Sequence, residues 1–122
     1  MTTHVATVNA IIESLLRRGF IDTDHLFDPE AMQTQVDAVI EELAEVARYL
    51  RRHRQRGDPL DIDKLSKEAA DTVIAATCLL TYVAGFAAPV VVSMTLAADE
   101  KRGWLHSGKT RAEFEAVQQT TP

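Results

Sequence analysis

The feature that most constrains the fold of this 122-residue chain is a run of 27 residues, Thr72 to Ala98, without Asp, Glu, Lys, Arg or His. A helix made from it is apolar on every face, so it belongs at the centre of a fold or at an interface. The run is also long enough to cross a bilayer. Gly85 and Pro89, however, divide it into two pieces that are each too short to span one. We therefore predict two buried helices joined by the turn 85–89, and no membrane span.

Size, charge and cysteine content narrow the class of protein further. A chain of this length forms one small domain with a single core. The net charge of −5 and the pI of about 5.3 argue against a nucleic-acid polymer as partner, because no positive field attracts one. Cys78 is the single cysteine, which excludes a disulfide framework and a thiolate metal site. With no signal-peptide pattern at the N-terminus, we predict a cytoplasmic domain with Cys78 as a buried, reduced thiol.

Hydrophobic periodicity predicts an all-α fold, because no segment alternates convincingly with period two. Asp28-Pro29 is typical of a helix N-cap and first residue, and Gly57-Asp58-Pro59 is a helix break. The expected helices cover about residues 3–18, 29–54, from Asp61 or Asp63 to 84, 89–101 and 110–118, and loops cover 20–27 and 102–109. Thr110 and Glu113 form a capping box that opens the last helix.

Acidic residues gather on one side of the helix expected at 29–54. Glu41, Glu42 and Glu45 share an arc of about 100°, and the apolar residues share an arc of about 120° largely on the opposite side. On an isolated helix this acidic arc would face solvent. A metal site there requires another element, from this chain or from a partner subunit, to cover it.

A second acidic pair, Glu68 and Asp71, stands directly before the uncharged run, with the i, i+3 spacing that places both on one helix face. Carboxylates beside so apolar a segment are costly to desolvate unless a positive charge meets them. A hard divalent cation can serve this pair and the pair Glu42 and Glu45 together. Ligands that are all oxygen favour Mg²⁺ or Mn²⁺ over Zn²⁺. The alternative is a solvated acidic face with no chemistry.

The acidic motifs resemble a known signature. Glu-Glu-Leu-Ala-Glu at 41–45, a gap of 22 residues and Glu-Ala-Ala-Asp at 68–71 are similar to the EExxE…ExxD pattern of MazG-like nucleotide pyrophosphohydrolases. The apolar helix after the second motif and the polar, basic segment 99–104 are similar as well. The resemblance covers about residues 30–105 of the single domain 1–122, and residues from about 106 to 122 form a tail.

The resemblance implies a fold, a reaction and a set of ligands. The fold is the all-α NTP pyrophosphatase fold, here a four-helix-bundle-like core with a short C-terminal helix, assembled as a homo-dimer or tetramer. The reaction cleaves a nucleoside triphosphate, NTP or dNTP, into monophosphate and pyrophosphate with Mg²⁺, Mn²⁺ being possible in its place. The implied metal ligands are Glu42, Glu45, Glu68 and Asp71. A bound cation would activate water for attack on the α-phosphorus.

Other residues receive roles around that centre. Glu41 is the candidate base. Lys101 and Arg102 are candidates for neutralising the polyphosphate, and Trp104 for stacking on the base or for a core or interface position. Asp99 stands where many members of the family have Asn, so it cannot donate to phosphate but could bind a second cation.

Two alternatives stay open: a phosphoribosyl-ATP pyrophosphatase of the same superfamily, and a non-catalytic helical interaction module. A third question concerns the five arginines between residues 48 and 56. They either form a solvated helix end that suits the helix dipole, or some of them bind phosphate oxygens.

Overall fold

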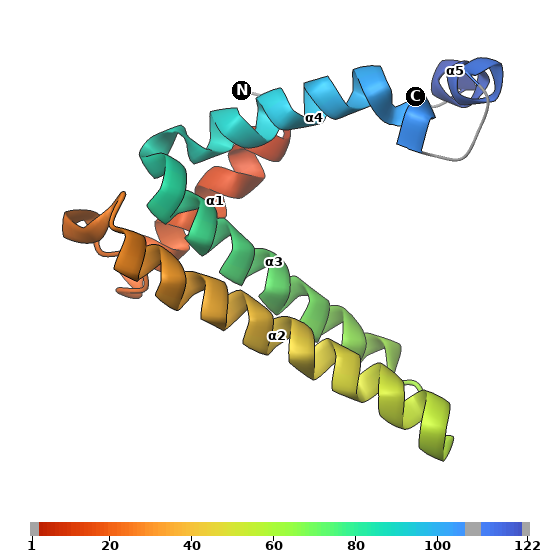
Figure 1. Cartoon of the computed structure of the whole chain (residues 1–122), viewed down its shortest axis with the longest axis horizontal. Helices are drawn as coiled ribbons and strands as arrows, with labels where there is room; N and C mark the ends of the chain where they lie inside the picture. The colour runs from red at the N-terminus through yellow and green to blue at the C-terminus, as the bar shows by residue number, and fades with distance from the viewer. Residues whose placement is uncertain (1–2, 107–110, 121–122) are drawn as a thin grey trace. The chain divides into compact units, whose positions relative to one another are not determined.

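The computed structural model describes residues 3–106 and 111–120, without the side chains at 3, 4, 103–106, 111, 114 and 118–120. The described residues form helices joined by short loops and contain no strand, which confirms the all-α prediction (Figure 1). Its elements are α1 (Thr3–Arg17), η1 (Thr23–His25), α2 (Pro29–Arg56), α3 (Ile62–Ala84), η2 (Gly85–Ala87), α4 (Ala88–His106) and α5 (Arg111–Thr120). They fall into two compact units, Met1–Pro89 and Val90–Pro122.

The ends of α2 and the start of α3 follow local sequence signals. The Asp28 side chain accepts a hydrogen bond from the Glu30 amide at 3.0 Å, with Pro29 as the first helical residue. Gly57 ends α2 in the left-handed conformation. Asp61, rather than Asp63, caps α3 by accepting from the Lys64 amide at 3.2 Å.

The end of α4 differs from the prediction. We expected a loop from Arg102 onward, but α4 continues to His106. Gly103 is the only unfavourable residue in this stretch, and one glycine costs a helix only about 1 kcal/mol relative to alanine. Neighbours with good helix propensity outweigh that cost, and no proline intervenes. The predicted loop residues 107–110, with the capping Thr110, lie outside the described residues.

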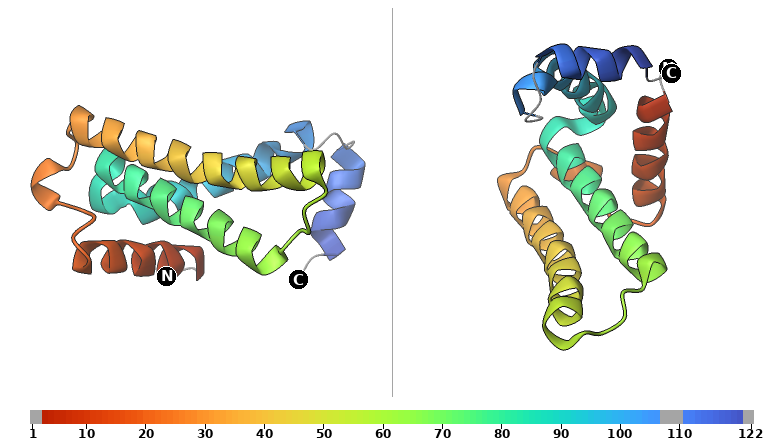
Figure 2. Two further views of the ribbon diagram at one scale, coloured as in Figure 1. Left: turned by 90° about the horizontal axis from the view of Figure 1, so that it is seen from below. Right: turned by 90° about the vertical axis from the view of Figure 1, so that its right-hand side faces the viewer.

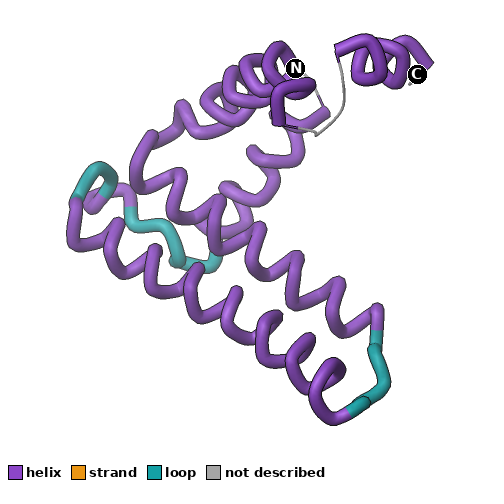
Figure 3. The backbone as a smooth tube through the Cα atoms, turned by 45° about the vertical axis from the view of Figure 1, so that its right-hand side comes forward, coloured by secondary structure: helices purple, strands orange, loops and turns teal. Residues whose placement is uncertain are grey.

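The first unit is built on an antiparallel hairpin of α2 and α3, which lie side by side in every view (Figures 1, 2 and 3). Helix α1 packs on α3 as well. The core lies toward the C-terminal end of α3 and consists of Ile12, Leu15, Ile21, Cys78, Tyr82 and Ala88. Burial of the free thiol of Cys78 is thereby confirmed, and this burial raises its pKa.

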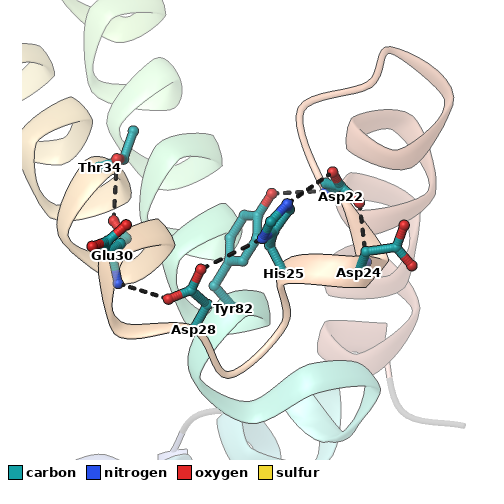
Figure 4. Close-up of polar contacts among 7 residues, drawn as sticks. All are labelled: Asp22, Asp24, His25, Asp28, Glu30, Thr34 and Tyr82. Carbon is teal, nitrogen blue, oxygen red and sulfur yellow. Dashed lines mark hydrogen bonds and ion pairs between the residues drawn. The ribbon is translucent and has the colours of Figure 1, made fainter.

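Tyr82 attaches the α1–α2 connection to α3 (Figure 4). Its phenolic oxygen accepts a hydrogen bond from the Asp22 amide at 2.8 Å and donates one to the Phe20 carbonyl at 3.2 Å. Between α1 and α2, His25 lies 3.4 Å from the Asp28 carboxylate and 3.7 Å from that of Asp22. The two hydrogen bonds of Tyr82 hold the α1–α2 connection on α3, and Tyr82 itself is fixed in position because its side chain is almost fully buried in the core.

The uncharged run is divided as predicted, because η2 separates α3 from α4 at Gly85–Ala87. Its burial is less complete than expected. Thr77, Cys78, Thr81 and Tyr82 of α3 are buried, whereas Val73 and Val83 are 59% and 49% exposed. Only one face of α3 therefore lies in the core of this unit.

Among the described residues, the helical segment Ile62–Arg102 has the length and apolar composition of a membrane span. A third of its most apolar window is buried. Core helices of soluble proteins meet the same criteria, so this finding alone is weak evidence for a span.

Gly85 and Gly57 form a matched pair for a stability test. Both have positive φ, but a Cβ on Gly85 would lie 2.8 Å from Cζ of Phe27, whereas a Cβ on Gly57 would meet nothing within 4 Å. We expect Gly57→Ala to cost about 1 kcal/mol, from backbone strain alone. We expect Gly85→Ala to cost more, about 2–4 kcal/mol, since it adds a steric clash in a backbone region that is almost restricted to glycine. Urea unfolding of both variants measures the difference, and equal costs would show that Phe27 does not brace the turn.

Candidate metal centre

Three carboxylates from two helices meet in the middle of the α2–α3 hairpin. One oxygen each of Glu42, Glu68 and Asp71 lies within 4.8 Å of the others, and all three residues are partly buried. The antiparallel packing explains why these residues meet. Residues nearer the C-terminus of α2 lie opposite residues nearer the N-terminus of α3, so Glu42 in α2 comes to lie opposite Glu68 and Asp71 in α3. Helix α3 thus partly covers Glu42, while Glu41 and Glu45 of the acidic arc stay exposed.

Glu45 lies next to this group without belonging to the set of three. A hydrogen bond between the carboxyl groups of Glu45 and Glu68 raises the pKa of Glu68. Partial desolvation and the negative charges of Glu45 and Asp71 raise the pKa further, while the positive charge of Lys67 lowers it. A raised pKa shows that the negative charges crowd one another when no cation is bound.

No protein cation neutralises the group. Across the residues that the structure describes, no Lys, Arg or His approaches the carboxylates of Glu42, Glu45, Glu68 or Asp71 within ion-pair distance. Uncompensated carboxylates on a partly buried face are unfavourable unless a ligand meets them. The donors are hard carboxylate oxygens that lie close to one another, so Glu42, Glu68 and Asp71 could hold a metal ion.

The remaining predicted site residues lie elsewhere. Glu41 is exposed and outside the group of three. Lys101 and Arg102 are exposed residues of α4 in the second unit, where Arg102 pairs with Asp99 at 3.2 Å. The side chain of Trp104 lies outside the described residues. Their roles at the site stay predictions.

The face of α2 that packs on α3 mixes an acidic residue with apolar ones, since Glu42, Val39 and Val46 are all partly buried. The acidic Glu42 is partly buried toward α3, while Ile40 and Leu43 are 59% and 52% exposed. Ala47 and Leu50 are exposed on the same stripe, which follows helical spacing. We refer to Ile40, Leu43, Ala47 and Leu50 as the outer stripe. Helix α2 therefore leaves part of its apolar arc exposed while Glu42 lies at the contact with α3.

Two recesses flank the acidic group on the hairpin. The apolar recess, of about 320 Å³, is lined by Leu15, Arg18, Phe20, Gln35, Ala38, Glu42, Asp71, Ile74, Ala75 and Cys78. It exists because Ala38 and Ala75 are small where the two helices face each other. The basic recess, of about 240 Å³, is lined by Glu45, Arg48, Tyr49, Arg52, Lys64 and Glu68.

Sequence reasoning missed several of these lining residues. Gln35, Tyr49 and Lys64 carry no motif, but the spacing from Gln35 through Glu42 to Tyr49 follows one helix face. If the register of α2 against α3 had been known, this face of α2 would have placed Tyr49 opposite Lys64 of α3. No family model, curated protein or solved structure matches this chain, so the assignment rests on the residues themselves.

Metal binding has a direct thermodynamic consequence. We expect millimolar Mg²⁺ or Mn²⁺ to raise the thermal midpoint, because a ligand at one hundred times its Kd stabilises the native state by about 2.7 kcal/mol. Calorimetry of the wild type and of the double variant Glu68→Gln with Asp71→Asn makes the comparison. The shift should vanish in the double variant, and an unchanged wild-type midpoint would contradict the site.

Proposed function

We propose that this protein is a Mg²⁺-dependent nucleoside triphosphate pyrophosphohydrolase of the MazG-like kind, which converts an NTP or dNTP into its monophosphate and pyrophosphate. The observation that supports it is the meeting of Glu42, Glu68 and Asp71 between two helices, with no ion pair from these carboxylates to a cation of the described residues. The motif spacing, which resembles that of the family, supports the same proposal. We place the enzyme in the cytoplasm, in keeping with the reduced, buried Cys78.

Each acidic residue has a part in the proposed reaction. Glu42, Glu68 and Asp71 hold the cation, and Glu45 completes the ligand set beside Glu68. The cation supplies Lewis acidity, which activates water and neutralises phosphate charge. Glu41 precedes Glu42 on α2 and is exposed, so it can accept a proton from water at the edge of the site.

For the basic and aromatic residues near the end of α4 we keep the roles that the sequence predicts. Lys101 and Arg102 would neutralise polyphosphate charge, and Trp104 would stack on the nucleobase. The ion pair between Arg102 and Asp99 would have to open or adjust for this contact, since the pair satisfies the guanidinium in its present arrangement.

We further propose that the working form is a homo-oligomer with a four-helix-bundle-like core. The outer stripe supports this proposal, because exposed apolar side chains at helical spacing are typical of an interface. A second copy that packs its own α2 against the stripe would bury it and form a symmetric contact. Such a contact leaves the acidic face of α2, which is turned toward α3, open to substrate.

Substitution of the acids separates a catalytic role from a structural one. We expect Asp71→Asn and Glu68→Gln to reduce triphosphate hydrolysis by about two to four orders of magnitude, since the cation generates the nucleophile. Metal-free stability should stay equal or rise, because the amide removes repulsion among carboxylates. Glu13→Gln, an exposed acid of α1, is the matched control.

The assay uses a panel of triphosphates and identifies the second product as pyrophosphate or phosphate. Pyrophosphate release by the wild type with loss in the two acid variants is the expected pattern. If Asp71→Asn hydrolyses triphosphates at the wild-type rate with the same Mg²⁺ dependence, the proposed site is wrong.

The oligomer has its own test. We expect light scattering to show at least a dimer at micromolar concentration, and we expect Leu43→Glu to shift it toward monomer, because a charge on the outer stripe cannot be buried cheaply. Thr34→Glu, on the opposite side of the same helix, should leave the mass unchanged. A monomeric wild type would refute the proposal.

A further inference from the structure

We infer that the basic recess binds the β- and γ-phosphates of the substrate, with Arg48, Arg52 and Lys64 as the phosphate contacts. The inference rests on the proposed function and adds the direction in which the triphosphate lies. The nucleoside lies toward the apolar recess, the α-phosphate at the acidic group, and the leaving pyrophosphate toward the connection between α2 and α3.

The order of side chains along the hairpin supports this direction. Glu42 and Asp71 line the apolar recess, whereas Glu45 and Glu68 line the basic recess. The acidic group therefore separates the two recesses on one face of α2 and α3. A nucleoside triphosphate has the same order of chemistry, with an apolar base at one end, a reacting phosphorus in the middle and the greatest negative charge at the other end.

The cations of the basic recess form no ion pair within the part of the chain that the structure describes. No carboxylate of the described chain lies within ion-pair distance of Arg48, Arg52 or Lys64. The helix dipole accounts for His53, Arg54 and Arg56, which occupy the last turn of α2. It does not account for Arg48 and Arg52, which lie further back and one turn apart, since the dipole effect fades beyond the last turn.

Tyr49 gives the recess a fixed wall. The Asp61 amide donates a hydrogen bond to its phenolic oxygen at 2.6 Å, which ties the ring to the N-cap of α3. Nζ of Lys64 lies 5.4 Å from the centre of the same ring, a cation–π contact that holds the ammonium group beside the recess. The ring of Tyr49 and the ammonium group of Lys64 are therefore held in place before any phosphate binds.

Size and charge separate the two recesses. Sites for whole drug-sized ligands measure about 300–1,000 Å³. The basic recess, at about 240 Å³, falls below that range and suits phosphoryl groups, while the apolar recess, at about 320 Å³, reaches it. Guanidinium groups at i, i+4 spacing present paired donors to phosphate oxygens. The carboxylates of Glu45 and Glu68 would repel phosphate alone, so the pyrophosphate group must enter as its Mg²⁺ complex.

This placement fits the bond changes of the reaction. The oxygen of water forms a bond to the α-phosphorus and loses one proton to a carboxylate. The bond from the α-phosphorus to the bridging oxygen breaks, and pyrophosphate leaves with that oxygen and the bonding electrons. Negative charge therefore develops on the leaving pyrophosphate, where Arg48, Arg52 and Lys64 stabilise it.

The test compares the two products as ligands. Binding of Mg²⁺-pyrophosphate and of nucleoside monophosphate is measured by calorimetry for the wild type, Arg52→Gln, Lys64→Gln and the control Arg54→Gln, which is on the same helix end but does not line the basic recess. We expect Arg52→Gln and Lys64→Gln each to weaken pyrophosphate binding by about ten-fold or more, and monophosphate binding by less than about two-fold. Arg54→Gln should change neither.

Three results would overturn the inference: unchanged pyrophosphate affinity in Arg52→Gln and Lys64→Gln, equal loss for both products, or equal loss in Arg54→Gln, which indicates only a diffuse basic surface. Circular dichroism confirms that each variant is folded. Hydrolysis by the wild type is measured alongside. An active wild type with unaltered pyrophosphate binding in the variants refutes the phosphate site alone, whereas an inactive wild type refutes the proposed function.

Discussion

The register of α2 against α3 is the constraint on which the candidate site depends. Because the helices run antiparallel, Glu42 faces Glu68 and Asp71, and Tyr49 faces Lys64. The contact between Glu42, Glu68 and Asp71 brings like charges within 4.8 Å of one another. Repulsion among these carboxylates therefore works against the packing of α2 on α3. The hairpin is held in this register by features outside the acidic group: the caps at Asp28 and Asp61, the short connection at Gly57, and the core around Tyr82.

The hairpin divides its length among three tasks. Toward the C-terminal end of α3 it packs against α1 and forms the core, with the connection to α1 hydrogen-bonded to Tyr82. The middle of the hairpin holds the carboxylates. The part toward the α2–α3 connection holds Arg48, Arg52 and Lys64 beside Tyr49, with no ion pair to a carboxylate of the described residues. Since the core lies at one end, the middle can accommodate charges whose mutual repulsion would be too costly inside it.

The outer stripe shows what this arrangement costs the isolated chain. A helix normally stabilises its fold by burying its apolar arc, but α2 brings Glu42 to the contact with α3 and leaves Ile40, Leu43 and Leu50 exposed. The apolar area that α2 does not bury within this unit is available to a second copy. The proposed assembly and the acidic group would then both depend on how α2 is rotated about its axis.

The sequence by itself determined the helices and most of their ends, because capping and breaking act within a few residues: Asp28-Pro29 and Gly57 mark α2 without any tertiary contact. It also placed Glu68 and Asp71 on one helix face through i, i+3 spacing, whereas Glu45, paired with Glu42 by the same spacing, lies outside the group of three. It could not extend α4 beyond Lys101, where helix propensity outweighed one glycine. Only the tertiary structure decided that α3 packs where the two arcs of α2 meet, so that Glu42 is partly buried together with Val39 and Val46. It also decided that Lys64 and Tyr49 share a recess with Arg52, because a register between two helices is a property of their packing and not of either helix alone.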